Sequence, residues 1–141
     1  MSILAVRYPS TDCVLRLEID AAAMRARLLR HMYGTRAAAD GWQEEYSTLL
    51  VSRGFRQGDA VPNVFYHAEK GIVTSVHGDD FTSAGPLDAL DWMEESIAKA
   101  YEITISPRLG PGPDDAKEER VLNRIIRWCD THIEYECDPR Q

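Results

Sequence analysis

Two adjacent carboxylates, Asp79 and Asp80, are the residues of this sequence best suited to chemistry. They follow Gly78 and lie between the apolar run Ile72–Val76 and a second strand-like run that begins at Phe81. Two ionised carboxylates side by side repel each other, and a divalent cation removes that repulsion. Mg²⁺ prefers carboxylate and phosphate oxygens as ligands. The pattern therefore indicates a tight turn that could hold Mg²⁺ or Mn²⁺ at one end of a sheet.

The same two residues have a second interpretation, because Asp in a turn commonly caps backbone N–H groups in water. The flanking apolar strands and the preceding Gly78 favour the functional interpretation. In a polymerase palm, metal ions bridge such carboxylates and a nucleoside triphosphate. Viral RNA-dependent RNA polymerases also use Gly-Asp-Asp, so the tripeptide alone leaves the class of polymerase open.

A second segment, from His31 to Trp42, lies upstream by about the length of one helix and one hairpin. It resembles the Leu-Tyr-Gly-Leu-Lys-Gln-Ala-Pro-Arg-Ala-Trp segment of copia-type retrotransposon reverse transcriptases. Tyr33, Gly34 and Trp42 match this pattern, as does Ala37, and Arg36 stands where a Lys is usual. This segment argues against the RNA-dependent RNA polymerase alternative.

Further segments resemble later motifs of that family in the same order. Ser52–Phe55 resembles its Leu-Gly-Phe, and Asp59–Phe65 resembles its Ala-Asp-Pro-Ser-Leu-Phe. Val76–Asp80 stands where the family has Tyr-Val-Asp-Asp. Leu109-Gly110 and the strand-like Val121–Trp128 resemble its Leu-Gly … Phe-Leu-Gly-Ile segment. The resemblance runs from about residue 27 to residue 135, which is most of the chain.

The resemblance implies a role for each matching position and a set of partners. The implied catalytic and metal-binding residues are Asp79 and Asp80, the nucleotide-binding residues are Gly34, Thr35 and Arg36, and the primer-proximal residues are His77 and Gly78. The implied cofactor is Mg²⁺ or Mn²⁺. The implied partners are an RNA or DNA template-primer, a deoxynucleoside triphosphate and the integrase and RNase H regions of a polyprotein. The implied reaction is RNA-directed DNA synthesis by two-metal nucleotidyl transfer.

One part of the family pattern is missing from this sequence. A reverse transcriptase needs a third Asp on an earlier strand, roughly fifty residues before the Tyr-Gly motif in that family, and only 32 residues precede Tyr33. Asp20 is the one candidate for this third Asp, but it lies too near Tyr33 in the sequence. The sequence therefore indicates a palm fragment that is close to inactive alone. The alternative is a degenerate, non-catalytic transposon remnant that acts at most as a small acidic interaction domain.

Strand and helix signals mix along the chain, which predicts an α+β fold: an antiparallel sheet with packed helices, forming part of a polymerase palm. Helical spacing predicts a helix over about 37–53, ended by Gly54, and another from Leu87 to about Ala100. Asp20–Met32 is ambiguous, although its alanines favour a helix. The expected strands are 15–19, 64–67, 72–76, 81–83, 101–105, 121–128 and 133–135. The expected organisation is a poorly assigned segment 1–26, a palm-like domain 27–136 and a tail 137–141.

Composition limits the remaining possibilities. The chain has 141 residues and a formal net charge of −7. An acidic chain attracts phosphate groups poorly, so a stand-alone nucleic-acid binder is not expected. No apolar run approaches the roughly 20 residues that cross a bilayer, so no membrane partner is expected. Three scattered cysteines, Cys13, Cys129 and Cys137, form no Cys-x-x-Cys pair. They are expected to be small buried apolar side chains, and as free thiols they favour an intracellular location in the cytoplasm or nucleus.

Overall fold

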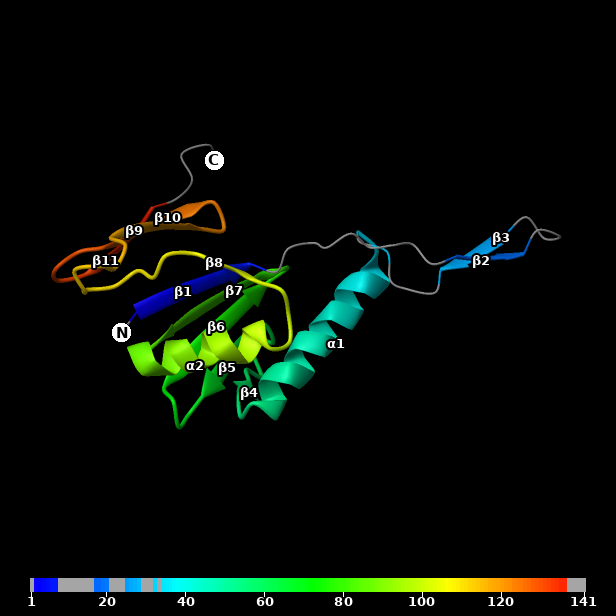
Figure 1. Ribbon diagram of the computed structural model, residues 1–141, viewed down its shortest axis with the longest axis horizontal. Helices are drawn as coiled ribbons and strands as arrows, with labels where there is room; N and C mark the ends of the chain where they lie inside the picture. The colour runs from blue at the N-terminus through cyan, green and yellow to red at the C-terminus, as the bar shows by residue number, and fades with distance from the viewer. Residues whose placement is uncertain (1, 8–16, 21–24, 29–31, 33, 137–141) are drawn as a thin grey trace. The chain divides into compact units, whose positions relative to one another are not determined.

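The computed structural model describes residues 2–7, 17–20, 25–28, 32 and 34–136 (Figure 1). Helices and antiparallel sheets are both present in these residues, which confirms the predicted α+β class. The chain divides into two compact units, one made of Met1–Pro9 with Phe55–Gln141 and the other of Ser10–Gly54. These limits differ from the expected boundary between residues 26 and 27, because the first residues of the chain share a unit with Asp79 and Asp80.

The unit Ser10–Gly54 contains helix α1 (Arg36–Ser52), close to its expected position. The helix begins after Thr35, whose Oγ1 accepts a hydrogen bond of 3.2 Å from the backbone N–H of Ala38. It is followed by Gly54 at φ +93°, a left-handed conformation that glycine adopts without strain. Thr35 and Gly54 thus define the two ends of the helix that helical spacing predicted.

The same unit contains the antiparallel pair β2 (Leu17–Asp20) and β3 (Arg25–Leu28). The helix favoured by the alanine run is wrong for Arg25–Leu28, which pair with β2 instead. Strand pairing overrides a weak local helix propensity here. Ala21–Met24 lie outside the described residues.

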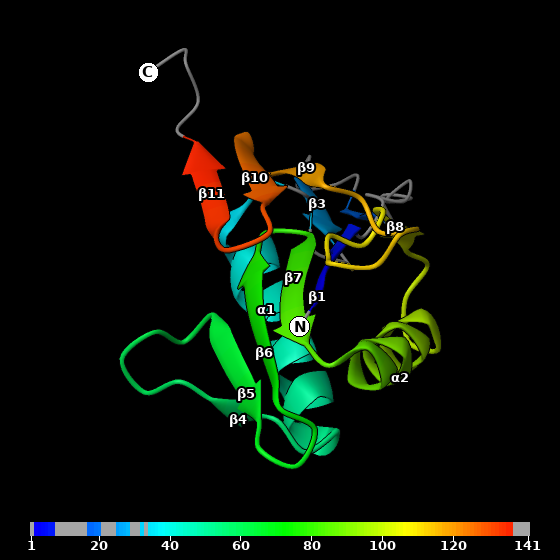
Figure 2. The same cartoon turned by 90° about the vertical axis from the view of Figure 1, so that its left-hand side faces the viewer.

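The other unit is built on a six-stranded antiparallel sheet, seen in Figures 1 and 2. Its strand order is β4-β5-β6-β7-β1-β8. The strands are β1 (Ser2–Arg7), β4 (Arg56–Gln57), β5 (Val64–His67), β6 (Ile72–His77), β7 (Asp80–Gly85) and β8 (Thr104–Ile105). The expected hairpin of 64–67 and 72–76 is confirmed, whereas the expected strand 101–105 is reduced to β8.

The first strand of the chain lies between β7 and β8, although it belongs to a segment that the sequence left unassigned. β7, α2 (Leu87–Ala98) and β8 follow one another along the chain and form a βαβ unit. β1 is inserted between the two strands of this unit, which is the split βαβ arrangement. Its consequence is that β1 becomes the direct neighbour of the strand that starts at Asp80.

One face of this sheet is buried, and α2 packs against β1 and β7. Along β6 and β7 the buried side chains alternate with more exposed ones, as expected for a sheet with one covered face. The buried residues include a pair of hydroxyls, Thr74 and Ser83, whose oxygens lie 2.9 Å apart and share a hydrogen bond. Besides Thr74 and Ser83, the core side chains that are less than 2% exposed on this unit's sheet and helix are Phe65, Ile72, Val76, Phe81, Leu90, Met93 and Ile97.

A separate three-stranded sheet has the order β11-β10-β9, from β9 (Glu118–Val121), β10 (Arg124–Trp128) and β11 (Ile133–Glu136). The single expected strand over 121–128 is wrong, because the chain turns back between β9 and β10. Leu122 and Asn123 make this turn at φ values of 51° and 62°. Asn adopts this left-handed conformation readily but Leu does so rarely, so the turn carried little sequence signal.

Candidate metal site

The turn between β6 and β7 contains two residues, Gly78 and Asp79, and the register closes it by pairing His77 with Asp80. Gly78 has φ +57°. A two-residue turn with glycine at its first position is the pattern of type II′ hairpins, which match the twist of the flanking strands. The tight turn expected at 77–80 is therefore present. Asp79 lies within it and Asp80 is the first residue of β7.

Asp80 lies on the more open face of the sheet. The buried residue Phe81 follows it, and the half-buried Thr82 returns to the open face. His77, at the end of β6, is exposed and shares this face with Asp80 through their register. Asp79 and Asp80 are each half-buried. The two carboxylates thus stand at one end of the sheet, with solvent access and a packed core behind them.

The strand beside Asp80 brings an arginine rather than an acid to this end of the sheet. In the register of β1 with β7, Arg7 is paired with Asp80 and Ala5 with Thr82. Residues 2–7 read Ser-Ile-Leu-Ala-Val-Arg and include no Asp or Glu. A two-metal site needs a further carboxylate on a neighbouring strand. The residues of β1, β6 and β7 therefore do not fit a complete two-metal site.

The other candidate for a third carboxylate, Asp20, is the last residue of β2. Its register partner on β3 is Arg25, and both belong to the unit Ser10–Gly54.

The residues expected at the nucleotide surround the start of α1. Gly34 has φ +85° and has no neighbour within 4 Å of the position of an added Cβ. The Thr35 hydroxyl caps the helix and also donates a 2.8 Å hydrogen bond to the carbonyl of Met32. The Arg36 side chain is 94% exposed, and its Nε lies 3.8 Å from Asp40 Oδ2. Thr35 thus has a demonstrated structural role, while Arg36 is an accessible cation. Tyr33 lies outside the described residues.

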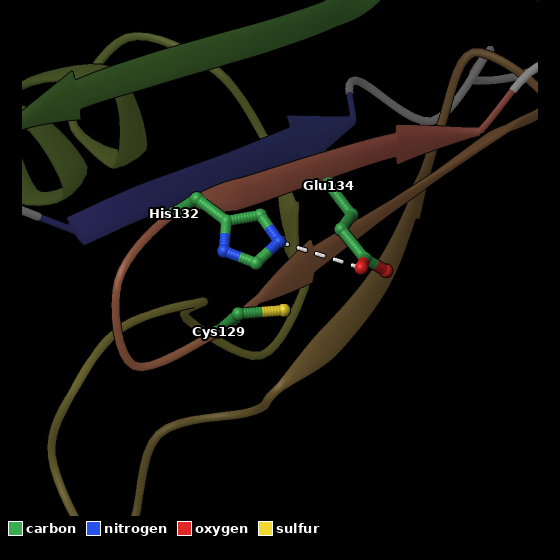
Figure 3. A group of neighbouring side chains, drawn as sticks. All are labelled: Cys129, His132 and Glu134. Carbon is green, nitrogen blue, oxygen red and sulfur yellow. Dashed lines mark hydrogen bonds and ion pairs between the residues drawn. The ribbon is translucent and has the colours of Figure 1, made fainter.

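Sequence reasoning missed a second group of metal-ligand types, shown in Figure 3. Cys129, His132 and Glu134 lie at the turn between β10 and β11, and each offers one donor atom within 4.8 Å of the others. His132 Nε2 is 3.4 Å from Glu134 Oε1. In the described part of the chain this is the group of three or more such residues that could hold an ion, and Asp79 and Asp80 are not in it. The available signal was the spacing Cys-x-x-His-x-Glu across an expected turn.

Cys129 also departs from the expectation of a buried apolar side chain. It is a free, half-buried thiol. Cys13 and Cys137 lie outside the described residues. A partly accessible thiol beside an imidazole and a carboxylate is the environment of a ligand rather than of a core side chain.

No family model, curated protein or solved structure matches the chain. A functional proposal for this chain therefore rests on its sequence and on the geometry of its residues. Among residues 2–7, 17–20, 25–28, 32 and 34–136, no helix combines the length and the apolar character needed to cross a bilayer.

An ion-pair cluster stabilises the three-stranded sheet next to the Cys129 group. Arg127 Nε lies 2.6 Å from Glu118 Oε2, and Arg127 Nη1 lies 2.5 Å from Glu136 Oε1. Glu134 Oε2 is more distant, at 3.8 Å from Nη1. The hydrogen bond from Arg127 lowers the pKa of the Glu136 carboxyl below its usual 4.5, and the same contact raises the pKa of Arg127.

We expect this sheet to loosen in acid. Because the pKa of Glu136 is lower in the folded state, its stabilising contribution is fully present above pH 4.5 and is lost as the pH falls through the folded-state pKa. Amide hydrogen exchange in β10 and β11, followed as the pH is lowered, measures this effect after correction for intrinsic exchange. Glu136→Gln is the control and should flatten the pH dependence. An unchanged profile in that variant would assign the acid sensitivity to another carboxylate.

Proposed function

We propose that this chain is the palm region of a copia-type retrotransposon reverse transcriptase, a part of a polyprotein that carries out RNA-directed DNA synthesis in its intact form. The observation that supports this proposal is the placement of Asp79 and Asp80 in a two-residue hairpin turn at one end of an antiparallel sheet. The split βαβ strand order adds support, because it makes β1, an earlier strand, the neighbour of that hairpin. In the proposed ancestry, this neighbour is the strand that carries the remaining catalytic Asp.

The chain as it stands is proposed to be inactive as a polymerase. In its β1, Arg7 is paired with Asp80, and this strand contains no Asp or Glu. Only two of the three carboxylates that a two-metal site needs are therefore present. Asp79 and Asp80 can hold one divalent cation loosely. Nucleotide-binding roles for Gly34, Thr35 and Arg36 and primer-proximal roles for His77 and Gly78 remain part of the proposal. Mg²⁺ or Mn²⁺, the template-primer and the deoxynucleoside triphosphate are proposed as ligands of the intact protein.

The second candidate function is that of a non-catalytic remnant, an acidic domain for protein contacts. The specific observation in its favour is the same Arg7–Asp80 register, because opposite charges at directly paired positions stabilise a sheet without any metal. A net charge of −7 suits solubility and contact with basic partners.

Sequencing of the transcript and locus around this frame separates the two candidates. For a slice of a working polymerase, we expect the frame to continue upstream into a strand that bears Asp and takes the place of β1 beside β7, and downstream into an RNase H region. The protein encoded by the extended frame should then extend a primer on an RNA template, and Asp79→Asn should abolish that activity. Stop codons on both sides would support the remnant. An extended frame whose protein extends primers equally well with Asp79→Asn would overturn the metal-site assignment.

A further inference from the structure

The turn between β10 and β11 brings a thiol, an imidazole and a carboxylate to one place, and none of these residues belongs to the proposed polymerase site. Figure 3 shows the His132 ring directed toward the Glu134 carboxylate, with the Cys129 thiol beside both. We propose that Cys129, His132 and Glu134 bind a single Zn²⁺ ion, with water or an external ligand at the fourth position. This site is independent of the reverse transcriptase ancestry.

The separations of the donor atoms fit a tetrahedral ion. Zn–N and Zn–O bonds of about 2.0–2.2 Å at a tetrahedral angle place the two ligand atoms roughly 3.3–3.5 Å apart. His132 Nε2 and Glu134 Oε1 are 3.4 Å apart. A Zn–S bond of about 2.3 Å requires a sulfur separation of roughly 3.6 Å from either atom. Because all three donor atoms lie within 4.8 Å, the thiol needs at most roughly one ångström of movement to complete the set.

The backbone holds these side chains in place before any ion binds. Trp128 pairs with Ile133 at the ends of β10 and β11, so Cys129 and His132 are the first and last residues of the loop between the strands. The N–H of Cys129 donates a 3.0 Å hydrogen bond to the carbonyl of His132. Two of the three ligands are therefore linked through their own main chain, which lowers the entropy lost on binding.

Neighbouring polar groups orient the ligands as outer-shell partners do in known metal sites. Thr131 Oγ1 lies 3.1 Å from His132 Nδ1. When Nδ1 carries the proton it donates to this hydroxyl and leaves the lone pair on Nε2, the nitrogen nearest Glu134. The two carboxylate oxygens of Glu134 have different partners: Oε2 lies toward Arg127 and Oε1 lies toward His132.

The donor set and the local charge select the kind of ion. Thiolate and imidazole suit Zn²⁺, whereas Mg²⁺ takes hard oxygen ligands. Arg127 is surrounded by three carboxylates, those of Glu118, Glu134 and Glu136, and its two shortest contacts are to Glu118 and Glu136. The excess negative charge around this hairpin attracts a divalent cation.

Zn²⁺ titration of the full chain against a chromophoric chelator tests the proposal, with Co²⁺ as a spectroscopic substitute. We expect one tightly bound ion per chain, distinct from loose binding at Asp79 and Asp80, and a thiolate-to-Co²⁺ charge-transfer band. Outer-shell losses weaken metal sites by about 10–100-fold. Cys129→Ser and His132→Gln each remove a ligand and should therefore weaken Zn²⁺ binding by about 100-fold or more. Thr131→Ala removes an orienting partner and should weaken it by about tenfold.

The controls separate this group from other thiols and histidines of the chain. Cys137→Ser and His31→Gln should leave both Zn²⁺ affinity and the Co²⁺ spectrum unchanged. Glu134→Gln should weaken binding but keep the charge-transfer band, whereas Cys129→Ser should lose it. Circular dichroism of each variant confirms that the fold is retained. The proposal is overturned by a charge-transfer band that survives in Cys129→Ser, by loss of that band in Cys137→Ser, or by the absence of saturable one-to-one binding in the parent chain.

Discussion

Arg7→Asp is expected to tighten Mn²⁺ binding at the Asp79–Asp80 turn by about tenfold or more, which is about 1.4 kcal/mol. The register pairs position 7 directly with Asp80 on the open face of the sheet. Directly opposed positions on one face of an antiparallel pair have Cβ atoms roughly 4.5–5.5 Å apart. The substitution removes a positive charge from this place and adds a third carboxylate. At such distances each unit charge changes the interaction with the divalent Mn²⁺ by about 7 kcal/mol near a protein surface, before screening by salt.

The comparison that isolates the ligand effect is Arg7→Asp against Arg7→Asn. Both remove the cation and have nearly the same shape, but only Asp supplies a carboxylate. Binding is measured by the electron paramagnetic resonance signal of free Mn²⁺, in a Cys129→Ser background that disables the second metal group. Asp79→Asn should abolish binding in both, and Asp59→Asn, in an exposed loop, should not. Equal affinities for the Asp and Asn variants would show that β1 does not complete the site.

The elements predicted best from sequence are those whose limits rest on local chemistry. The ends of α1 follow from a capping Thr35 and from Gly54. The β6–β7 hairpin follows from the strand-like runs Ile72–Val76 and Phe81–Ser83 on the two sides of Gly78, whose positive φ the turn requires. In these cases each residue's own preference agrees with the tertiary structure, so short-range reasoning succeeds.

The elements that sequence reasoning missed depend on partners distant in the chain. Ser2–Arg7 form β1 because β7 and β8 provide hydrogen-bonding edges on both sides. Nothing in the local pattern of Ser-Ile-Leu-Ala-Val-Arg identifies those partners. The turn at Leu122 is a second case, since Leu at φ 51° contradicts its own preference.

The candidate sites divide in the same way. Asp79 and Asp80 were found because they are adjacent in sequence and lie in one turn. Arg7 could be related to them only through the register of β1 with β7. The Cys129 group is local, but its three donor atoms converge only because the β10–β11 register brings the two ends of the loop together.

Phe81→Ala is expected to cost about 3–5 kcal/mol of folding free energy, the usual range for a buried aromatic side chain. Phe81 is 1% exposed, and its register partner on β6, Val76, is also buried. A domain of this size is stable by about 5–15 kcal/mol, so the loss is a large share of the total. Urea unfolding followed by far-UV circular dichroism measures it. The control is Thr82→Ala, because Thr82 is half-buried and lies on the open face of the sheet. Its expected cost is about 1 kcal/mol at most.

The same substitution tests what keeps the Asp80 side chain on the open face of the sheet, where metal binding is proposed. In a strand the side chains alternate between faces, so a slip of one residue would bury Asp80 and expose its neighbour. Burial of Phe81 makes that slip costly and thereby holds Asp80 on the open face. Phe81→Ala should therefore weaken Mn²⁺ binding even under conditions where the variant is folded, whereas Thr82→Ala should not. A folded Phe81→Ala chain with parental Mn²⁺ affinity would show that the turn holds its carboxylates without help from the core.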